Sequence, residues 1–162
     1  AQHYPYYATY QRHGNALMDC IIRRGRLTHL PGIVERGDIR QVIRLLKQGN
    51  IVWLAPDQDV GPQRSVLAPF FGIDTATTPI ISRLASATGA KVLQFSHHRT
   101  QLDQAYLLSI TDSLASIPSG QLEADAAVLN AAIEAKVRLK PTQYLWLHRR
   151  FKTRPKNSPD IY

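Results

Sequence analysis

The chain has 162 residues, of which 44% are hydrophobic and 20% charged, and its formal net charge at pH 7 is +8. This composition excludes a disordered or fibrous protein and predicts a single domain over residues 1–162, large enough to bury about 70% of its unfolded surface. The excess positive charge suits an anionic partner: nucleic acid, an anionic membrane surface, a phosphorylated glycolipid or an acidic protein. Charge alone does not choose among these four.

The content of cysteine and histidine narrows the possible chemistry. A single cysteine, Cys20, excludes an internal disulfide framework and a cysteine-based zinc site. The six histidines show no metal-ligand spacing, and we expect no metal site. The sequence shows no signal peptide and no run near the roughly 18 apolar residues of a membrane span. Because the chain opens on Ala1 rather than methionine, we expect a fragment of a longer protein.

The first third of the chain predicts two helices and a strand. Asn15 can cap a helix that stops at Gly25. Asp38 can cap a second helix, whose apolar residues repeat at helical spacing until Gly49 ends it. Residues 51–55 are a short, wholly apolar run, which is typical of a buried strand.

The next stretch predicts a βαβ unit. Thr78 and Pro79 mark the start of a helix, as its N-cap and first helical residue, and Gly89 marks its end. Residues 91–95 are a second strand, so the helix would join it to strand 51–55 as a parallel pair with a right-handed crossover.

The remaining elements complete an α/β fold. Residues 105–110 predict a further strand, 121–139 the longest helix, and 144–148 a last strand or a helical turn. We therefore expect an α/β protein with a single-layer mixed, largely parallel sheet flanked by helices.

Two groups of charged residues are candidates for chemistry in the first two thirds of the chain. Asp57 and Asp59 directly follow a predicted strand, where α/β proteins gather functional groups, although loop aspartates are more often turn formers. Arg23, Arg24 and Arg26 surround the end of the first helix. They complement the helix dipole by default, but Arg26, just past Gly25, could project into a cleft.

The most informative stretch is residues 143–155, QYLWLHRRFKTRP, in which an apolar, aromatic run leads into a basic one. Arginine forks bind phosphate or carboxylate with two hydrogen bonds and stay charged at any working pH. A basic run is usually a solvated tail, but the interleaved aromatic residues argue against that reading. We predict an anion-binding surface formed by Arg149, Arg150, Lys152 and Arg154, with His148 as a possible fifth cation.

Several blocks, in order, resemble the late acyltransferases of lipid A biosynthesis in Gram-negative bacteria. They are Tyr10 with Asn15 to Asp19, Gly25-Arg26, residues 52–61, 65–72 and 76–78, and the closing block 143–155. The resemblance covers nearly the whole chain, and the last block is highly specific. Departures are modest: Ala16 stands in place of a usual proline, and Leu54 in place of a common tyrosine.

The resemblance implies an enzyme at the cytoplasmic side of the inner membrane, with a glycerolipid-acyltransferase-like fold. It would move a fatty acyl chain from acyl carrier protein to a hydroxyl of a Kdo-lipid A type acceptor. No cofactor is implied, because the thioester already carries the activated acyl group. Arg26 and Asp57 match functional positions of the family. Arg26 would contact the catalytic acid or an anionic substrate group, and Asp57 would fix Arg26 or the catalytic dyad. The four cations of the closing block would bind the acceptor or anionic lipid, or brace the fold.

Family members also carry a membrane helix and a His-x-x-x-x-Asp/Glu dyad, whose histidine deprotonates the acceptor hydroxyl. By the family pattern this dyad lies shortly before Tyr10, so we expect it upstream of Ala1 and expect the isolated chain to be inactive. His98 and Asp103 satisfy the spacing, but they follow the wrong strand and about 0.4 such matches arise by chance. We reject them as the active site.

Two other functions remain open. The chain could be a non-catalytic module that binds anionic lipid or acyl carrier protein. A nucleic-acid binder is permitted by the charge, but no recognised motif supports it, and we rank it far below the others.

Overall fold

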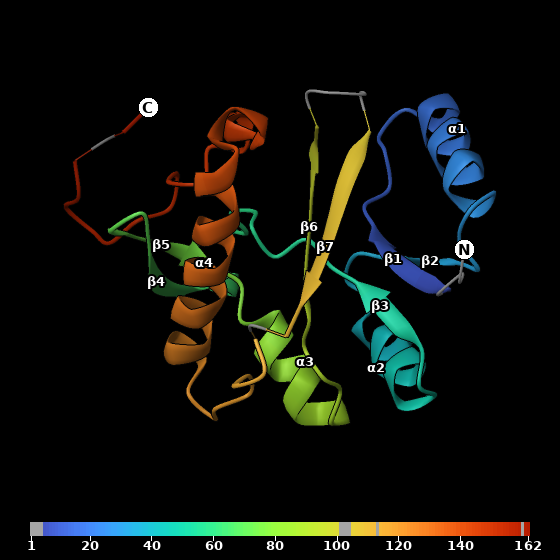
Figure 1. Cartoon of the computed structure of the whole chain (residues 1–162), viewed down its shortest axis with the longest axis horizontal. Coiled ribbons are helices and arrows are strands. Elements are labelled where there is room, and N and C mark those ends of the chain that lie inside the picture. Colours follow the sequence, from blue (N-terminus) through green and yellow to red (C-terminus); the bar gives the residue numbers. More distant parts are fainter. Residues whose placement is uncertain (1–4, 101–104, 113, 160) are drawn as a thin grey trace. The chain divides into compact units, whose positions relative to one another are not determined.

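The computed structural model describes residues 5–100, 105–112, 114–159 and 161–162. Its backbone divides into two compact units, one of residues up to 55 with 87–90, the other of residues 56–86 with 91–162. Figure 1 shows the elements along the chain. Among the helices of the described residues, none combines the length and the apolar composition needed to cross a membrane.

The first unit is a parallel three-stranded sheet with two crossover helices. The strand order is β2-β1-β3, and both neighbours run parallel to β1. Its core holds Ala8, Tyr10, Val34, Val42 and Leu45. The elements are β1 (Tyr6–Tyr10), α1 (Ala16–Leu27), β2 (Ile33–Glu35), α2 (Ile39–Lys47) and β3 (Ile51–Trp53).

Both predicted helix starts of this unit are confirmed. The Asn15 side chain accepts a hydrogen bond from the Met18 N–H at 3.0 Å, and Asp38 accepts one from the Gln41 N–H at 3.0 Å. Each satisfies a donor that the first helical turn leaves without a partner.

Two boundaries of this unit differ from the prediction. Helix α1 does not stop at Gly25 but continues to Leu27, where the Thr28 hydroxyl donates to the Gly25 carbonyl at 2.6 Å. A glycine inside a helix costs only about 1 kcal/mol, which the neighbouring turns offset. The predicted buried strand 51–55 is shorter and lies at the edge of the sheet, with Ile51 52% exposed.

The polar contacts of Asp19 fasten α1 to β1. Asp19 and Tyr10 are both buried, and the Tyr10 hydroxyl donates a hydrogen bond to the Asp19 carboxylate. The same carboxylate oxygen accepts the His13 N–H at 2.8 Å. These bonds hold the pKa of Asp19 below its ordinary value, with Tyr10 the largest contributor.

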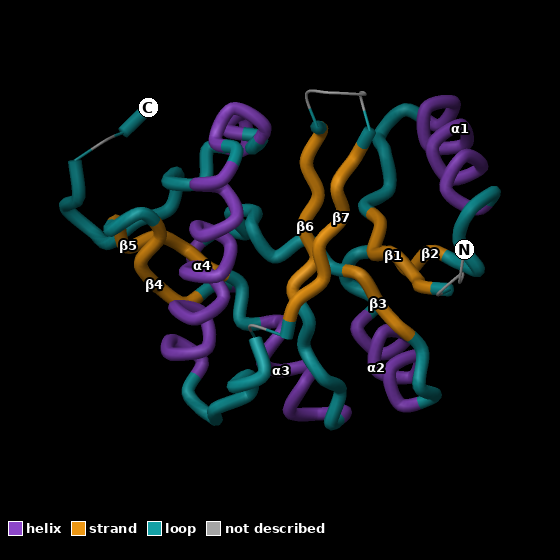
Figure 2. Tube along the Cα trace, viewed as in Figure 1, coloured by secondary structure: helices purple, strands orange, loops and turns teal. Residues whose placement is uncertain are grey.

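The second unit combines two antiparallel hairpins with the longest helix. Strands β4 and β5 pair with each other, and β6 and β7 form the other pair, as Figure 2 shows. Helix α4 packs against β4. The elements are β4 (Val66–Phe70), β5 (Ile73–Thr77), α3 (Ile80–Thr88), β6 (Gln94–Arg99), β7 (Tyr106–Thr111), α4 (Leu122–Leu139) and the 3₁₀ turns η1 (Pro62–Arg64), η2 (Pro141–Gln143) and η3 (Trp146–His148).

The structure confirms the α/β class but corrects the sheet. The predicted βαβ unit over 51–95 is wrong: β3 pairs with β1, and β6 pairs with β7 in antiparallel fashion. Between β3 and β6 along the chain lies the β4–β5 hairpin, whose two strands the sequence did not predict. Phe71 and Gly72 turn this hairpin with positive φ angles of 51° and 75°. Within the described residues the strands therefore form three sheets, one parallel and two antiparallel, instead of a single, largely parallel one.

The other predictions for the second unit hold with small shifts. Helix α4 matches the predicted longest helix, and Thr78 lies just before α3, where its hydroxyl accepts the Ile80 N–H at 3.4 Å. The strands expected at 91–95 and 105–110 start a little later, at Gln94 and Tyr106. The segment 144–148 contains a helical turn, one of the two alternatives.

Arg150 fastens the C-terminal segment to the core of the second unit. Its side chain is 2% exposed and lies over the ring of Phe70, 5.1 Å from the centroid. Its guanidinium donates to the Ala76 carbonyl, to the Thr77 hydroxyl at 2.8 Å and to the Asn130 amide oxygen at 3.2 Å. One cation thus joins β5, α4 and the chain end.

Further hydrogen bonds, from side chains and from the backbone of β5, extend this attachment. The Thr75 hydroxyl donates to the Arg150 carbonyl at 2.8 Å, and the Ala76 N–H donates to the Thr153 carbonyl at 3.0 Å. Asn130 also donates to the Pro69 carbonyl at 3.0 Å and to the Thr77 hydroxyl at 2.9 Å. We call Arg150, Thr77 and Asn130 the buried network.

We expect Arg150→Met to lower the free energy of unfolding by about 3 kcal/mol. The Ala76 carbonyl and the Asn130 amide oxygen lose a buried donor, and the Thr77 hydroxyl loses one of its two donors, at about 1 kcal/mol or more each. Urea unfolding followed by circular dichroism measures the change. Lys152→Met removes an exposed cation nearby and should stay within about 0.5 kcal/mol of the parent. Equal stabilities of the two variants would contradict the role given to the buried network.

We expect the contribution of Asp19 to stability to depend on pH. Since folding lowers its pKa, the contribution is fully present above the unfolded pKa of about 3.9 and is lost as pH falls through the folded pKa. The stability difference between the parent and Asp19→Asn should therefore be largest near pH 7 and shrink below about pH 4. Urea unfolding from neutral to acidic pH tests this, with the exposed Asp74→Asn as control. A difference that stays constant with pH would refute it.

Candidate active site

Arg26 lies in the last turn of α1, with its guanidinium over the ring of Tyr10, 5.2 Å from the centroid. The sequence analysis placed Arg26 beyond the helix, whereas the structure places it within α1. Arg26 is exposed, and the described residues offer its guanidinium no carboxylate within ion-pair distance. Its hydrogen-bond donors are therefore available to an anionic group.

The neighbour of Arg26 is the ring of Tyr10, which is held in place by its hydrogen bond to Asp19. Burial, with the hydrogen bond to Asp19 as a second cause, raises the pKa of the Tyr10 hydroxyl, so Tyr10 stays neutral at working pH. A neutral ring presents its electron-rich face to the guanidinium. Tyr10 thus connects Asp19 to Arg26, and the structure brings together three residues from two blocks of the sequence.

Asp59 forms the turn of the loop 56–62 and attaches it to the C-terminal segment. Its carboxylate accepts the Gly61 N–H at 2.8 Å, an Asx-type turn, and the Thr153 N–H at 2.7 Å. Of the two roles considered for this aspartate, the geometry shows the turn former.

Asp57 is half-buried, and its charge acts on two buried groups of the second unit. Burial is the main cause that raises the pKa of Tyr144, and the negative charge of Asp57 adds to it. Burial also lowers the pKa of Arg150, while the negative charges of Asp59 and Asp57 favour its charged form. Asp57 therefore helps to balance the buried cation from the loop that follows β3.

The four cations of the closing block lie in three different environments. Arg149 and Lys152 are exposed. Arg150 is buried in the network described above. Arg154 is half-buried and donates to the Pro159 carbonyl. Arg149 and Lys152 are thus the members whose charge faces solvent, while Arg150 is used by the fold.

The polar residues on the inner face of α4 were missed by the sequence analysis. Asp125 and Asn130 are 3% and 0% exposed and lie among the apolar residues Ala126 and Leu129 of the same helix. A polar residue within an apolar helical stripe was the available signal.

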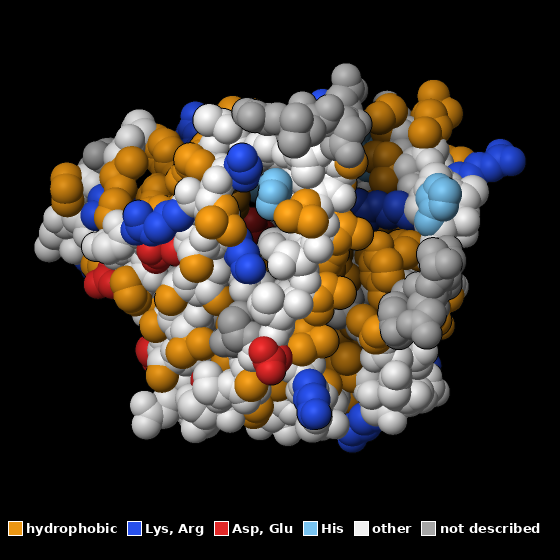
Figure 3. Space-filling view, in the orientation of Figure 1, with side chains coloured by type: hydrophobic (Ala, Val, Ile, Leu, Met, Phe, Trp, Pro, Cys, Tyr) orange, Lys and Arg blue, Asp and Glu red, His pale blue; other side chains and the backbone are white. Residues whose placement is uncertain are grey.

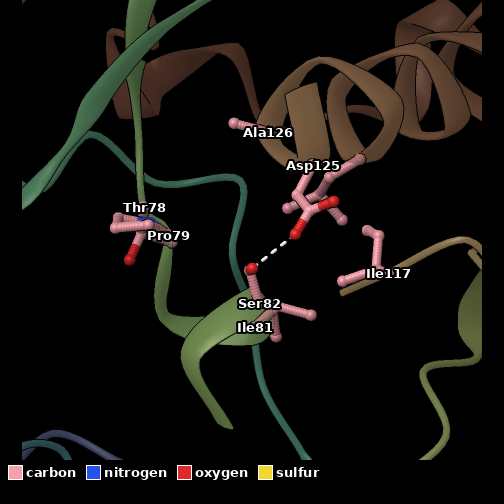
Figure 4. Close-up of a pocket in the computed structure, with 8 residues that line it drawn as sticks. Thr78, Pro79, Ile81, Ser82, Ile117, Asp125 and Ala126 are labelled. Atoms are coloured by element: carbon pink, nitrogen blue, oxygen red, sulfur yellow. Dashed lines mark hydrogen bonds between the residues drawn. The ribbon is translucent and has the colours of Figure 1, made fainter. Parts of the chain in front are cut away.

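Figure 4 shows Asp125 at a small cavity lined by Pro79, Ile81, Ile117 and Leu129, among others. Burial would raise the pKa of Asp125, but hydrogen bonds from Ser82 and Ser119 bring it below its ordinary value. The cavity, of about 10 Å³, has room for a water molecule at most, so Asp125 ties α3 to α4 rather than serving a ligand.

Of the rejected pair His98 and Asp103, the structure describes His98 alone. His98 was expected in the connection after a strand, but it lies within β6, which forms the hairpin with β7. Asp103 lies outside the described residues.

Comparison with known proteins gives one consistent family. The family model for bacterial lipid A biosynthesis acyltransferases matches residues 1–153. The chain is 38% identical over 162 residues to the lipid A biosynthesis palmitoleoyltransferase of Escherichia coli K12 and 37% identical over 159 residues to its lauroyltransferase, covering 98% of this chain and 52% of each relative. A lipid A biosynthesis acyltransferase of Haemophilus influenzae is 34% identical, over 99% of this chain and 52% of the relative.

The chain thus spans about half the length of these curated relatives. The family match covers both units, from the Tyr10–Arg26 contact to the buried network of Arg150. This protein belongs to the bacterial lipid A biosynthesis acyltransferase family.

Proposed function

We propose that these residues form the C-terminal part of an acyltransferase that moves a fatty acyl chain from acyl carrier protein to a hydroxyl of a Kdo-lipid A type acceptor, at the cytoplasmic face of the inner membrane. The observation that carries the proposal is the family match over residues 1–153. The parallel sheet of the first unit, with its crossover helices, is compatible with the glycerolipid-acyltransferase-like fold we propose for the whole enzyme.

The reaction joins the acceptor oxygen to the acyl carbonyl carbon. A base takes the hydroxyl proton, the oxygen attacks the thioester, and the carrier thiolate leaves and regains a proton. We assign the base to a His-x-x-x-x-Asp/Glu dyad of the type that the family carries.

We assign to Arg26 the role of binding an anionic group and holding it in place for the reaction. This group is either the carboxylate of the dyad or a charged group of the substrate. Support comes from its exposed guanidinium and from the buried Tyr10–Asp19 pair, which fixes the surface beneath it. A planar guanidinium can bind a carboxylate or phosphate through two hydrogen bonds, which also orients the bound group.

We infer that Asp57 acts by positioning other residues and does not contact the substrate. Its charge acts on Arg150 and Tyr144, which hold the C-terminal segment to the second unit. Arg149 and Lys152 are the exposed cations that we assign to acceptor phosphates or carboxylates, whereas Arg150 and Arg154 hold the segment that carries them.

A non-catalytic module for anionic lipid is the second candidate, and the exposed Arg149 and Lys152 favour it. The two functions separate in one assay. Transfer from acyl carrier protein to a lipid A precursor, measured in the natural protein that contains these residues, supports the enzyme. Salt-sensitive lipid binding without any transfer supports the module.

We expect Arg26→Ala in that protein to lower kcat/KM for acyl transfer by about 100-fold or more, because a preorganised donor to a charged group is removed. Arg26→Lys keeps the charge but not the planar fork, and should recover part of the loss. The matched control is Arg24→Ala, an exposed arginine of the same helix, with activity near the parent. Equal activity of Arg26→Ala and Arg24→Ala would exclude Arg26 from the site.

We expect Asp57→Asn to lower kcat by about tenfold while KM changes little, since a positioning charge is lost and no substrate contact is removed. Asp57→Glu, which retains the charge, should recover part of the rate. The exposed Asp74→Asn serves as the control for charge. A loss of rate matched by an equal loss of folded protein would show that Asp57 supports only the fold.

A further inference from the structure

The positive charge of this protein is concentrated in one segment. Residues 135–159 contain eight of the 20 lysines and arginines and none of the 12 acidic residues. The remaining residues therefore carry 12 charges of each sign, so the entire net charge of +8 belongs to this segment. Such segregation favours binding to an extended anionic surface.

The same segment presents apolar side chains to solvent. Leu139, Leu145, Trp146 and Leu147 are 63%, 54%, 44% and 88% exposed. Leu139 is the last residue of α4, Leu145 lies between the short turns η2 and η3, and Trp146 and Leu147 lie in η3. Figure 3 shows hydrophobic and basic side chains next to one another where α4 and these turns face the viewer.

These apolar residues are held in place by specific contacts. The Trp146 indole N–H donates to the Pro141 carbonyl at 2.9 Å, and its ring meets Tyr144 edge-to-face with centroids 4.9 Å apart. The ring of Phe71 also packs against Trp146, with centroids 6.0 Å apart. Arg149 follows in a left-handed conformation, with φ 44°. A built turn therefore directs Leu147 outward.

Exposed cations surround the turn. Lys140 precedes it, as does Arg138, which is paired with Glu134 at 3.6 Å, and Arg149 and Lys152 follow it. Leucine and tryptophan side chains are stabilised at the boundary between lipid headgroups and acyl chains. Neighbouring cations are stabilised there by electrostatic attraction to anionic headgroups. A nucleic acid or a free anion would use the cations but leave the leucines in water.

We propose that residues 138–152 dock on an anionic lipid bilayer, with Leu147 and Trp146 entering the headgroup layer and the flanking cations contacting lipid phosphates. We name this segment the docking turn. The inference rests on the proposed function and deepens it, because an acyltransferase with a lipid acceptor must meet its substrate at a membrane surface.

The β6–β7 hairpin also exposes apolar side chains, including Leu108 at 62% and Ile110 at 67%. Only Arg99 adds a cation on the described part of its strands. The hairpin therefore lacks the cluster of cations that makes an anionic bilayer the partner of the docking turn.

The chain offers a direct probe of insertion, because Trp53 and Trp146 are its two tryptophans. In the Trp53→Phe background, emission reports Trp146 alone. The full chain is titrated with vesicles of phosphatidylcholine containing about 30% phosphatidylglycerol, and with vesicles of phosphatidylcholine alone. We expect a shift of emission to shorter wavelength and quenching by brominated acyl chains on the anionic vesicles, both weakened by salt.

Two variants separate the apolar and the cationic contributions. Leu147→Ser should weaken the partition constant by about tenfold, and Leu17→Ser, at another exposed leucine (69%), should leave it unchanged. Arg149→Gln should weaken it by about fivefold, while the exposed Arg40→Gln on α2 should not. Because Leu147 is almost fully exposed, its substitution leaves the fold intact.

Three results would overturn the docking turn: no emission shift on anionic vesicles, equal loss of binding for Leu147→Ser and Leu17→Ser, or a shift produced as strongly by inorganic phosphate or DNA. These readouts do not involve acyl transfer. Vesicle binding without transfer by the natural protein therefore rejects the proposed enzyme, and transfer without vesicle binding rejects the docking turn.

Discussion

Arg150 carries a positive charge into the interior of the second unit, and the arrangement of that unit depends on how this charge is accommodated. The Phe70 ring, the Thr77 hydroxyl, the Asn130 amide and a β5 carbonyl supply its immediate partners. A buried guanidinium is tolerated when its charge is balanced and most of its donors are paired. In Arg150 both terminal nitrogens donate hydrogen bonds, while the buried Nε has no partner among the described residues. The partners come from β4, β5 and α4, so the charge links three elements, and Asp57 and Asp59 balance it from the loop 56–62.

The parts of the fold that were predictable from the sequence are those decided within a few residues. Asn15 and Asp38 cap helices because each side chain reaches an N–H three residues away. Strand pairing is decided by residues far apart in the sequence. Strand β3 pairs with β1 and not with β6, and no pattern within residues 51–95 indicates this. The burial of Arg150 was equally hidden, since two of its partners, Thr77 and Asn130, lie 73 and 20 residues away in the sequence.

The candidate site shows the same division. The family resemblance included Tyr10 and Asp19 in one block and Arg26 in the next, and the structure supplies the contacts between them. Sequence patterns identify the residue types that chemistry requires, but hydrogen-bond partners and exposure decide the role of each. Asp57 and Asp59 illustrate this. Both lie in one loop and balance Arg150, but Asp59 also accepts the Thr153 N–H, whereas the charge of Asp57 also acts on Tyr144.

The left-handed backbone of Arg149 has a consequence for how the basic block evolves. A residue with positive φ reverses the direction of the chain locally, so adjacent arginines can point to solvent and to the core. Selection for the fold and selection for the surface therefore act on neighbouring codons. A basic motif preserved across relatives can record both pressures at once, and one of its arginines can be conserved without ever meeting a ligand.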